Sequence, residues 1–381
     1  MTVRQLALAQ AGIAVSDHSL PATEREPTLP LRRYGSARSG SPAALLLHGA
    51  GANSDTFLLP NGGIVRYLVA RGFDVWVLDW RGSRCVLDAL ERAPLGGSLI
   101  AERGLFTLDH VAESDIPRAL AAIRAVAGER PSLGVLGFCA AGAALSMAVA
   151  RGKLEDFGVS ALVFVALGLF CETPWDGWIK AEDFILERLL VEAPDCRCVD
   201  PHAERWPACL EDAFRAWPWL PGGATRLDRV FRRLTFMYGE PYARERMSRA
   251  VDERALLSLF GPLHLGLYLH AGQLVRRGYA ARFDRPDIVP RHAESVPPTF
   301  EDDLLPEHFA RKRATLITGA ENRLWHRDSM DRMHDWLLSN ASFRREPLHR
   351  KHVLRDYAHL DLFLGEGAET DVYPLIEAGL R

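Results

Sequence analysis

Short apolar runs recur toward both ends of the chain, with stretches of helical periodicity between them. The runs at Ala43–Leu47, Asp74–Trp80, Leu133–Leu136 and Val159–Leu167 consist mostly of apolar residues. A strand that is buried on both faces has this continuous pattern, whereas a half-exposed strand alternates apolar and polar positions. The alternation of such runs with helices predicts an α/β protein with a mostly parallel sheet and helices on both of its faces.

The remaining elements complete this sheet. Gly12–Val15 and Leu31–Tyr34 indicate an edge hairpin, and Ala314–Ile317 and His352–Leu354 indicate the last strands. We expect Thr370–Leu380 to form the last helix.

Two intervening helices have recognisable ends. One is predicted from Ile64 to Arg71. The other is capped by Ser114 or Asp115, carries an apolar stripe and ends at Gly128.

The pattern changes between the two groups of strands. From Cys171 to about residue 310 the chain is rich in Trp, Arg, Pro and acidic residues, with helical pieces at Ala181–Val191 and Ala250–Leu259. We therefore expect a core made of residues 1–170 and 311–381, interrupted by a large helical cap at residues 171–310.

Composition narrows the class of protein. Hydrophobic residues make up 48% and charged residues 25% of the 381 positions, and the net charge of -3 argues against a nucleic-acid surface. No apolar run reaches the length of a membrane span, and the N-terminal residues lack the pattern of a signal peptide. Six cysteines in so long a chain do not suggest a disulfide framework, so we expect reduced thiols and a cytoplasmic protein.

The most informative stretch is Leu133-Gly-Val-Leu-Gly-Phe-Cys-Ala-Ala-Gly142. An apolar strand stops at a glycine, presents Cys139 and continues at once into a helical pattern, which is the layout of a nucleophile elbow. The sharp turn requires small residues two positions before and after the nucleophile, and these are Gly137 and Ala141. The alternative interpretation of Cys139 is a buried structural cysteine before a core helix.

A second loop can supply an oxyanion hole. His48-Gly-Ala-Gly-Ala-Asn53 follows a buried strand directly, where glycines let backbone N–H groups point into a cleft. We expect the N–H groups of Ala50, or of its neighbour, and of Ala140 to hold the oxyanion, each contributing about 3 kcal/mol to transition-state stabilisation. The alternative is an ordinary glycine-rich turn.

The expected base and its partner follow the last strands. In this kind of fold the order along the chain is nucleophile, acid, base, so His359 in Tyr357-Ala-His-Leu-Asp361 is the expected base. The acid position in Thr318-Gly-Ala-Glu-Asn-Arg-Leu324 is occupied by Asn322, with Glu321 as the rival. A neutral amide can orient the ring of a Cys–His pair, which can rest as a thiolate–imidazolium pair. We therefore expect a catalytic Cys139 with a lowered pKa.

The cap offers weaker signals. Cys196, Cys198, His202 and Cys209 have residue types that bind zinc, but their spacing matches no standard finger, so unlinked thiols are the better interpretation. No cofactor motif stands out, and the expected chemistry requires no metal. The tryptophans of the cap suggest either a covered pocket for an acyl chain or a polyketide- or sterol-like substrate, or packing of the cap on the core; they are Trp175, Trp178, Trp206, Trp217 and Trp219.

With these residues in place, the chain resembles the α/β-hydrolase superfamily. More narrowly, it is similar to the hydrolase-like domain found beside or fused to cholesterol-oxidase-type flavoproteins, a group that often has Cys at the elbow and a Glu-Asn pair in the acid loop. The matching stretches include Leu46-Leu-His-Gly-Ala-Gly51, Phe73-Asp-Val-Trp-Val-Leu-Asp-Trp-Arg81, Phe138-Cys-Ala-Ala-Gly142, Leu234-Thr-Phe-Met-Tyr-Gly-Glu240 and Thr318-Gly-Ala-Glu-Asn322.

Two further resemblances imply different activities. Ile64-Val-Arg-Tyr-Leu-Val69 and Asp79-Trp-Arg81, ahead of a Cys elbow, are similar to polyhydroxyalkanoate synthases, which transfer hydroxyacyl groups from coenzyme A thioesters. Those enzymes have Gly where this chain has Ala141 and Asp where it has Asn322. The closing His359-Leu-Asp-Leu-Phe363 is similar to acid lipases, which hydrolyse esters with Ser.

The leading hypothesis is acyl transfer through an acyl-Cys139 intermediate, from a coenzyme A or carrier-protein thioester or from an ester. Thiolates are good nucleophiles toward thioesters, which favours acyltransferase, condensing or thioesterase chemistry. The alternatives are an ester hydrolase and a non-catalytic binding or partner domain that kept the fold. The sequence fixes neither the acceptor nor the oligomeric state.

Overall fold

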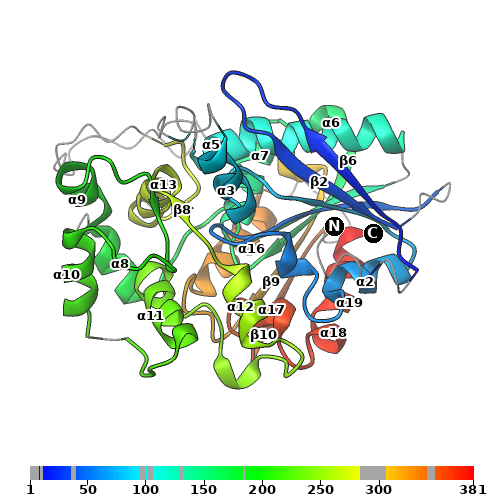
Figure 1. The fold of residues 1–381 in the computed structure, drawn as a ribbon. Helices are drawn as coiled ribbons and strands as arrows, with labels where there is room; N and C mark the ends of the chain where they lie inside the picture. Colours follow the sequence, from blue (N-terminus) through cyan, green and yellow to red (C-terminus); the bar gives the residue numbers. More distant parts are fainter. Residues whose placement is uncertain are drawn as a thin grey trace.

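A computed structural model describes residues 8, 12–35, 40–93, 100, 106–128, 132–182, 185–218, 220–283, 306–340 and 348–381. Its main sheet has eight strands in the order β1-β2-β4-β3-β5-β6-β9-β10 (Figure 1). β1 and β2 form an antiparallel hairpin, β2 pairs antiparallel with β4, and the other neighbours are parallel. The strands are β1 (Val15–Leu20), β2 (Leu29–Tyr34), β3 (Ala43–Leu47), β4 (Asp74–Leu78), β5 (Leu133–Phe138), β6 (Val159–Val165), β9 (Arg313–Gly319) and β10 (His349–Leu354).

Alternate residues of the central strands face opposite sides of the sheet, because side chains alternate along a strand. Leu45 and Leu47 of β3 join the core cluster that contains α6 (Ile116–Ala127) and α7 (Ala140–Ala150). Ala44 and Leu46 join the other cluster, with α2 (Gly63–Ala70) and α19 (Tyr373–Leu380). These helix pairs lie on opposite sides of the sheet in Figure 1, which confirms the predicted architecture.

Several predicted boundaries differ from the structure, and three of the differences have a clear cause. The first strand begins at Val15, where the prediction ended, and its exposed polar residues give little apolar signal. The helix predicted from Thr370 is divided at Val372 into α18 (Ala368–Asp371) and α19. The helix capped by Ser114 or Asp115 is preceded by a π-helical turn, η3 (Val111–Asp115), which continues directly into α6.

Other helices cover the sheet ends and loops. They are the 3-10 helix η1 (Ser54–Phe57), α3 (Arg84–Arg92), α5 (Leu108–His110), the 3-10 helix η4 (Glu155–Phe157), α15 (Glu307–Ala310), α16 (Asp328–Ser339) and α17 (Asp361–Leu364). Among the described residues, no helix combines the length and the apolar character that crossing a bilayer requires.

The chain between β6 and β9 is mainly helical and lies beside the sheet, on the left of Figure 1. The predicted helix at Ala181–Val191 is two helices, whereas the piece at Ala250–Leu259 is one helix that Asp252 caps. The described elements are α8 (Trp175–Glu182), α9 (Ile185–Glu192), β7 (Cys198–Val199), α10 (Ala208–Ala216), α11 (Arg226–Tyr238), η5 (Arg244–Arg246), α12 (Glu253–Leu259), β8 (Leu263–His264) and α13 (Leu265–Arg277).

The two ends of this segment meet at one place. Phe170 and Tyr279 form an antiparallel bridge. The Cys171 N–H donates to the Gly278 carbonyl oxygen at 3.0 Å, and the Ala280 N–H donates to that of Leu169 at 2.8 Å. Residues 171–278 thus begin and end side by side.

Candidate active site

Cys139 occupies the apex of a sharp turn between β5 and α7. Its φ of 57° and ψ of -131° are unusual for a residue that is not glycine. The Cys139 N–H donates to the Val165 carbonyl oxygen of β6 at 2.9 Å, and the Gly142 N–H donates to the Cys139 carbonyl oxygen at 2.7 Å. The neighbouring strand and the helix therefore hold the strained backbone in place, as a nucleophile elbow requires.

Close packing explains the small residues of the turn. A Cβ at Gly137 would lie 2.8 Å from the Ala141 carbonyl oxygen, and Ala141 itself is buried. The tightest position is Gly142, where a Cβ would lie 2.0 Å from the Leu167 carbonyl oxygen. The requirement for small residues at the elbow is thus confirmed and extends to Gly142.

The glycine-rich loop after β3 lies against the elbow. A Cβ at Gly49 would lie 3.1 Å from the Cys139 Cβ and 3.6 Å from its sulfur. Trp80 Nε1 donates to the His48 carbonyl oxygen at 2.8 Å, and His48 Nδ1 lies 2.7 Å from the Gly49 carbonyl oxygen. Ala50 follows and lines the same cavity as Cys139.

The buried carboxylate of Asp79 contacts both ends of this loop, at His48 and at Ser54. Asp79 accepts hydrogen bonds from the Ser54 N–H at 2.8 Å and from Arg32 Nη1 at 2.7 Å, and His48 Nε2 lies 3.4 Å away. Burial alone would raise the pKa of Asp79, but the His48 hydrogen bond and the charges of His48 and Arg32 outweigh it and lower that pKa to about 2.

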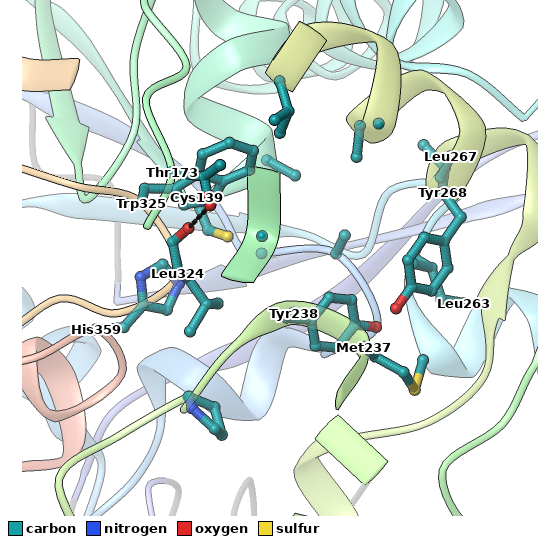
Figure 2. Close-up of a pocket in the computed structure, with 18 of the residues that line it drawn as sticks. Cys139, Thr173, Met237, Tyr238, Leu263, Leu267, Tyr268, Leu324, Trp325 and His359 are labelled. Atoms are coloured by element: carbon teal, nitrogen blue, oxygen red, sulfur yellow. Dashed lines mark hydrogen bonds between the residues drawn. The ribbon is translucent and has the colours of Figure 1, made fainter. Parts of the chain in front are cut away.

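Cys139 opens into a cavity of about 160 Å³ (Figure 2). His359, after β10, and Trp325, after β9, line the same cavity, as do Ala50 and Ala140. The structure therefore brings the predicted nucleophile, base and oxyanion-hole residues to one place. The rest of the lining is mostly apolar and comes largely from α8, α11 and α13.

The predicted nucleophile and base both rest in their neutral forms. Burial raises the pKa of the Cys139 thiol to about 11, although hydrogen bonds from the Trp325 side chain and the Ala140 N–H oppose this. Burial lowers the pKa of His359 to about 3. The expectation of a thiolate–imidazolium pair with a lowered Cys139 pKa is therefore wrong, because burial penalises both charges.

The predicted acid loop lies beside the base loop but makes no hydrogen bond to the ring. The Glu321 N–H donates to the Tyr357 carbonyl oxygen at 3.0 Å, while the Glu321 side chain is exposed. Asn322 is buried, and its Oδ1 accepts from the N–H groups of Leu324 and Trp325 at 3.1 and 3.2 Å.

Two buried nitrogens in these loops lack partners. Asn322 Nδ2 and His359 Nδ1 are both buried without a hydrogen-bond partner. Burial favours Asn322 over Glu321 as the residue that faces the base, although its Oδ1 is used within its own loop.

Trp325 was missed from the sequence. It stands one residue beyond the predicted acid loop, and its indole points toward the Cys139 sulfur, which lies close by in Figure 2. The only sequence signal is its position directly after that loop.

The described tryptophans of the predicted cap do not line the cavity. Trp175 and Trp178 are about half exposed, whereas Trp206 and Trp217 pack in a core cluster. Trp219 lies outside the described residues. Of the two interpretations, packing fits Trp206 and Trp217.

The cap cysteines do not form a cluster with His202. Cys196 Sγ donates to the Cys198 carbonyl oxygen at 3.4 Å, and His202 Nε2 lies 3.1 Å from the Phe260 carbonyl oxygen. Within the described part of the chain, no group of three or more His, Cys, Asp or Glu residues is arranged to hold a metal ion. None of the cysteines described there, Cys209 included, forms a disulfide.

Comparison with known sequences identifies no relative: no protein-family model and no curated protein matches the chain. Solved structures do match. A lipase in its open form has a TM-score of 0.58 at 12% identity, with 96% of this chain and 98% of that chain covered. A carboxyl esterase from Bacillus coagulans, in complex with glycerol, has a TM-score of 0.56 at 13% identity, with 97% and 99% covered.

A third match is a soluble variant of monoglyceride lipase from Saccharomyces cerevisiae in complex with a substrate analogue, with a TM-score of 0.51 at 11% identity and 96% and 94% coverage. At such identities these matches show the fold alone. The resemblances to flavoprotein-associated hydrolases and polyhydroxyalkanoate synthases stay predictions. Together with the strand order and the cysteine elbow, the matches show that this chain has the α/β-hydrolase fold.

Proposed function

We propose that this protein is an enzyme that transfers acyl groups from esters or thioesters through a covalent intermediate on Cys139. The observation that carries the proposal is a strained cysteine at an elbow that opens into a cavity shared with His359 and with two backbone donors, Ala50 and Ala140. A structural cysteine in a core would need neither the strain nor the opening.

The neutral resting state suggests how the first step proceeds. His359 Nε2 takes the thiol proton while the sulfur attacks the carbonyl carbon, so that neither charge forms alone in the cavity. The carbonyl oxygen becomes an oxyanion that the N–H groups of Ala50 and Ala140 stabilise. When the oxyanion collapses, the bond to the leaving group breaks and the leaving group takes the proton from His359.

The second step regenerates the thiol. Water, an alcohol or an amine loses a proton to His359 as it attacks the acyl-Cys139 carbonyl, and the sulfur leaves and regains that proton. Asn322 is our candidate for orienting the ring, with Glu321 as a weaker rival. Lipases and esterases among the structures that share the fold support ester hydrolysis as the second candidate reaction.

We further propose that residues 171–310 act as a lid over the residues 1–170 and 311–381. The side chains of α8, α11 and α13 in the cavity wall support this role. A coenzyme A or carrier-protein group is too large for a cavity of about 160 Å³, so such a donor would have to place only its acyl chain inside.

The test is intact-protein mass spectrometry after incubation with a panel of acyl thioesters and aryl esters, together with product analysis in the presence of water, alcohols and amines. The wild type is expected to gain one acyl group, and Cys139→Ala is expected to gain none. Cys209→Ala is the matched control and should behave as the wild type. The identity of the released product separates hydrolysis from transfer.

If neither an adduct nor turnover is found with any donor, the acyl-enzyme proposal fails. A non-catalytic binding domain would then be the remaining hypothesis.

A further inference from the structure

Two tyrosines line the cavity at a distance from the reacting residues. Tyr238 ends α11 and Tyr268 lies in α13, and their rings stack with centroids 5.7 Å apart and planes 9° apart. Figure 2 shows both across the cavity from Cys139 and His359, with their hydroxyl oxygens turned toward the same region.

Neither hydroxyl has a hydrogen-bond partner in the described part of the chain. Tyr238 Oη is buried and unpaired, and the 7% exposed Tyr268 makes no hydrogen bond through its hydroxyl. An unpaired buried hydroxyl costs about 1–3 kcal/mol. Such groups in a cavity wall indicate a ligand that satisfies them.

Away from Cys139 and His359, the other polar side chains of the lining already have partners. Thr173 Oγ1 donates to the Leu324 carbonyl oxygen at 3.0 Å. Lys180 Nζ donates to the Phe236 carbonyl oxygen at 3.1 Å and lies 3.4 Å from Asp176. The cavity therefore presents uncharged tyrosine hydroxyls within an apolar wall, and no unpaired charge among its described lining residues.

The hydroxyls are suited to an uncharged oxygen. Burial raises the pKa of both Tyr238 and Tyr268, so both stay protonated and can donate. A carboxylate or phosphate would have to be buried here without an unpaired cation, because Lys180 is already paired with Asp176, and such burial is unfavourable. A keto or hydroxyl oxygen accepts from a tyrosine without this cost.

The loop after β3 fixes the position of one hydroxyl. A Cβ at Gly51 would lie 2.6 Å from Tyr238 Oη, so the hydroxyl rests directly against this residue, next to Ala50. The flanking cavity residues Met237, Leu263 and Leu267 are apolar. A ligand that reaches both the sulfur and the tyrosines is therefore a mainly apolar chain with one polar group away from its reacting end.

We infer that the cavity binds an acyl chain that carries an uncharged keto or hydroxyl oxygen several carbons from the reacting carbonyl, and that Tyr238 and Tyr268 donate hydrogen bonds to this oxygen. The inference rests on the proposed function and names its substrate class. The acyl chain, rather than the leaving group, fills the cavity because a large leaving group would not fit.

The kinetic test uses p-nitrophenyl octanoate and its keto isomers with the oxygen moved along the chain. In the wild type, one isomer is expected to exceed the plain ester in kcat/KM by about tenfold or more. Tyr238→Phe and Tyr268→Phe should each reduce this ratio by about tenfold. Tyr242→Phe, a buried tyrosine outside the cavity, is the control and should leave the ratio unchanged.

A binding test is independent of turnover. Calorimetry on Cys139→Ala with methyl octanoate and its methyl keto isomers should show about tenfold tighter binding of one keto ester, and adding Tyr238→Phe should abolish the difference. Tyr238→Phe should not lower the thermal midpoint of unfolding, because it removes a hydroxyl that has no hydrogen-bond partner. If the hydroxyl had a structural role instead, its removal would lower that midpoint.

Equal affinity of Cys139→Ala for plain and keto esters at every position overturns this inference, whatever the catalytic result. Discrimination in Cys139→Ala without any acylation of the wild type would instead keep the binding site and reject the proposed function.

Discussion

In the proposed mechanism, Cys139 is a buried nucleophile that burial keeps protonated at rest. Its thiol and the His359 ring are each neutral because the cavity penalises charge. A bound carbonyl changes this balance, since the developing negative charge moves to an oxygen that backbone donors stabilise. Reactivity toward a substrate can therefore exceed reactivity toward a general alkylating reagent.

The first prediction concerns the pH dependence of alkylation. The rate at which iodoacetamide modifies Cys139 should be low at neutral pH and should rise about tenfold per pH unit toward its pKa of about 11. Peptide mass spectrometry at several pH values measures this rate. A plateau below pH 8 would show that the thiol has a lowered pKa and would contradict the resting state described above.

The second prediction concerns Trp325. Trp325→Phe removes the indole N–H that faces the sulfur, so the pKa of Cys139 should rise further and kcat/KM for acyl transfer should fall about tenfold. Trp336→Phe, which alters a tryptophan packed on Phe309 outside the cavity, is the control. Equal effects of the two changes would assign Trp325 to packing alone.

At the scale of elements, the elbow depends on close contact between α7 and the chain after β6. Gly142→Ala would place a methyl group 2.0 Å from the Leu167 carbonyl oxygen. We expect a loss of about 3 kcal/mol in the free energy of unfolding, measured with urea. Gly272→Ala in α13 should instead gain about 0.5–1 kcal/mol, because its Cβ would meet only the end of Arg276, at 3.6 Å. Similar stabilities of the two variants would refute the packing argument.

Elements buried on both faces were the easiest to predict. Ala43–Leu47 was predicted with its observed bounds. A short run in which every residue is apolar fits a central strand, because such a strand is buried on both faces. The polar strand β1 was misplaced because its pairing with β2, rather than its own residues, determines where it begins.

The site was predictable where chain order carries information. That Cys139 and His359 line one cavity was predicted because the fold orders the nucleophile and the base along the chain, and their catalytic roles stay a prediction. Their protonation was not predicted correctly, since burial of the cavity depends on α8, α11 and α13. The sequence does not indicate that the Tyr238 hydroxyl is unpaired. The residues around a tyrosine are the same whether or not its hydroxyl has a hydrogen-bond partner in the fold.

At the scale of the whole molecule, Asp79 links β4 to β2 and to the loop that holds Ala50. Its pKa falls from 3.8 to about 2 on folding, so it stabilises the protein above about pH 4, and this stability is lost as the pH falls toward 2. The shift corresponds to about 2 kcal/mol.

Urea unfolding at a series of pH values tests this contribution. The difference in stability between the wild type and Asp79→Asn should shrink by about 2 kcal/mol between pH 5 and pH 2. Other carboxylates titrate in both proteins, so their contributions to the free energy of unfolding cancel in this difference. Parallel curves for the two proteins would show that Asp79 does not have a lowered pKa.

The pairing of Phe170 with Tyr279 has a consequence for how this protein can diversify. Because residues 171–278 begin and end at adjacent positions, we expect insertions or deletions between these two points to leave the register of β6 and β9 unchanged. The residues of the cavity wall can therefore change while the turn at Cys139 stays in place. If Cys139 is the nucleophile that we propose, the same cysteine can then serve different acyl chains.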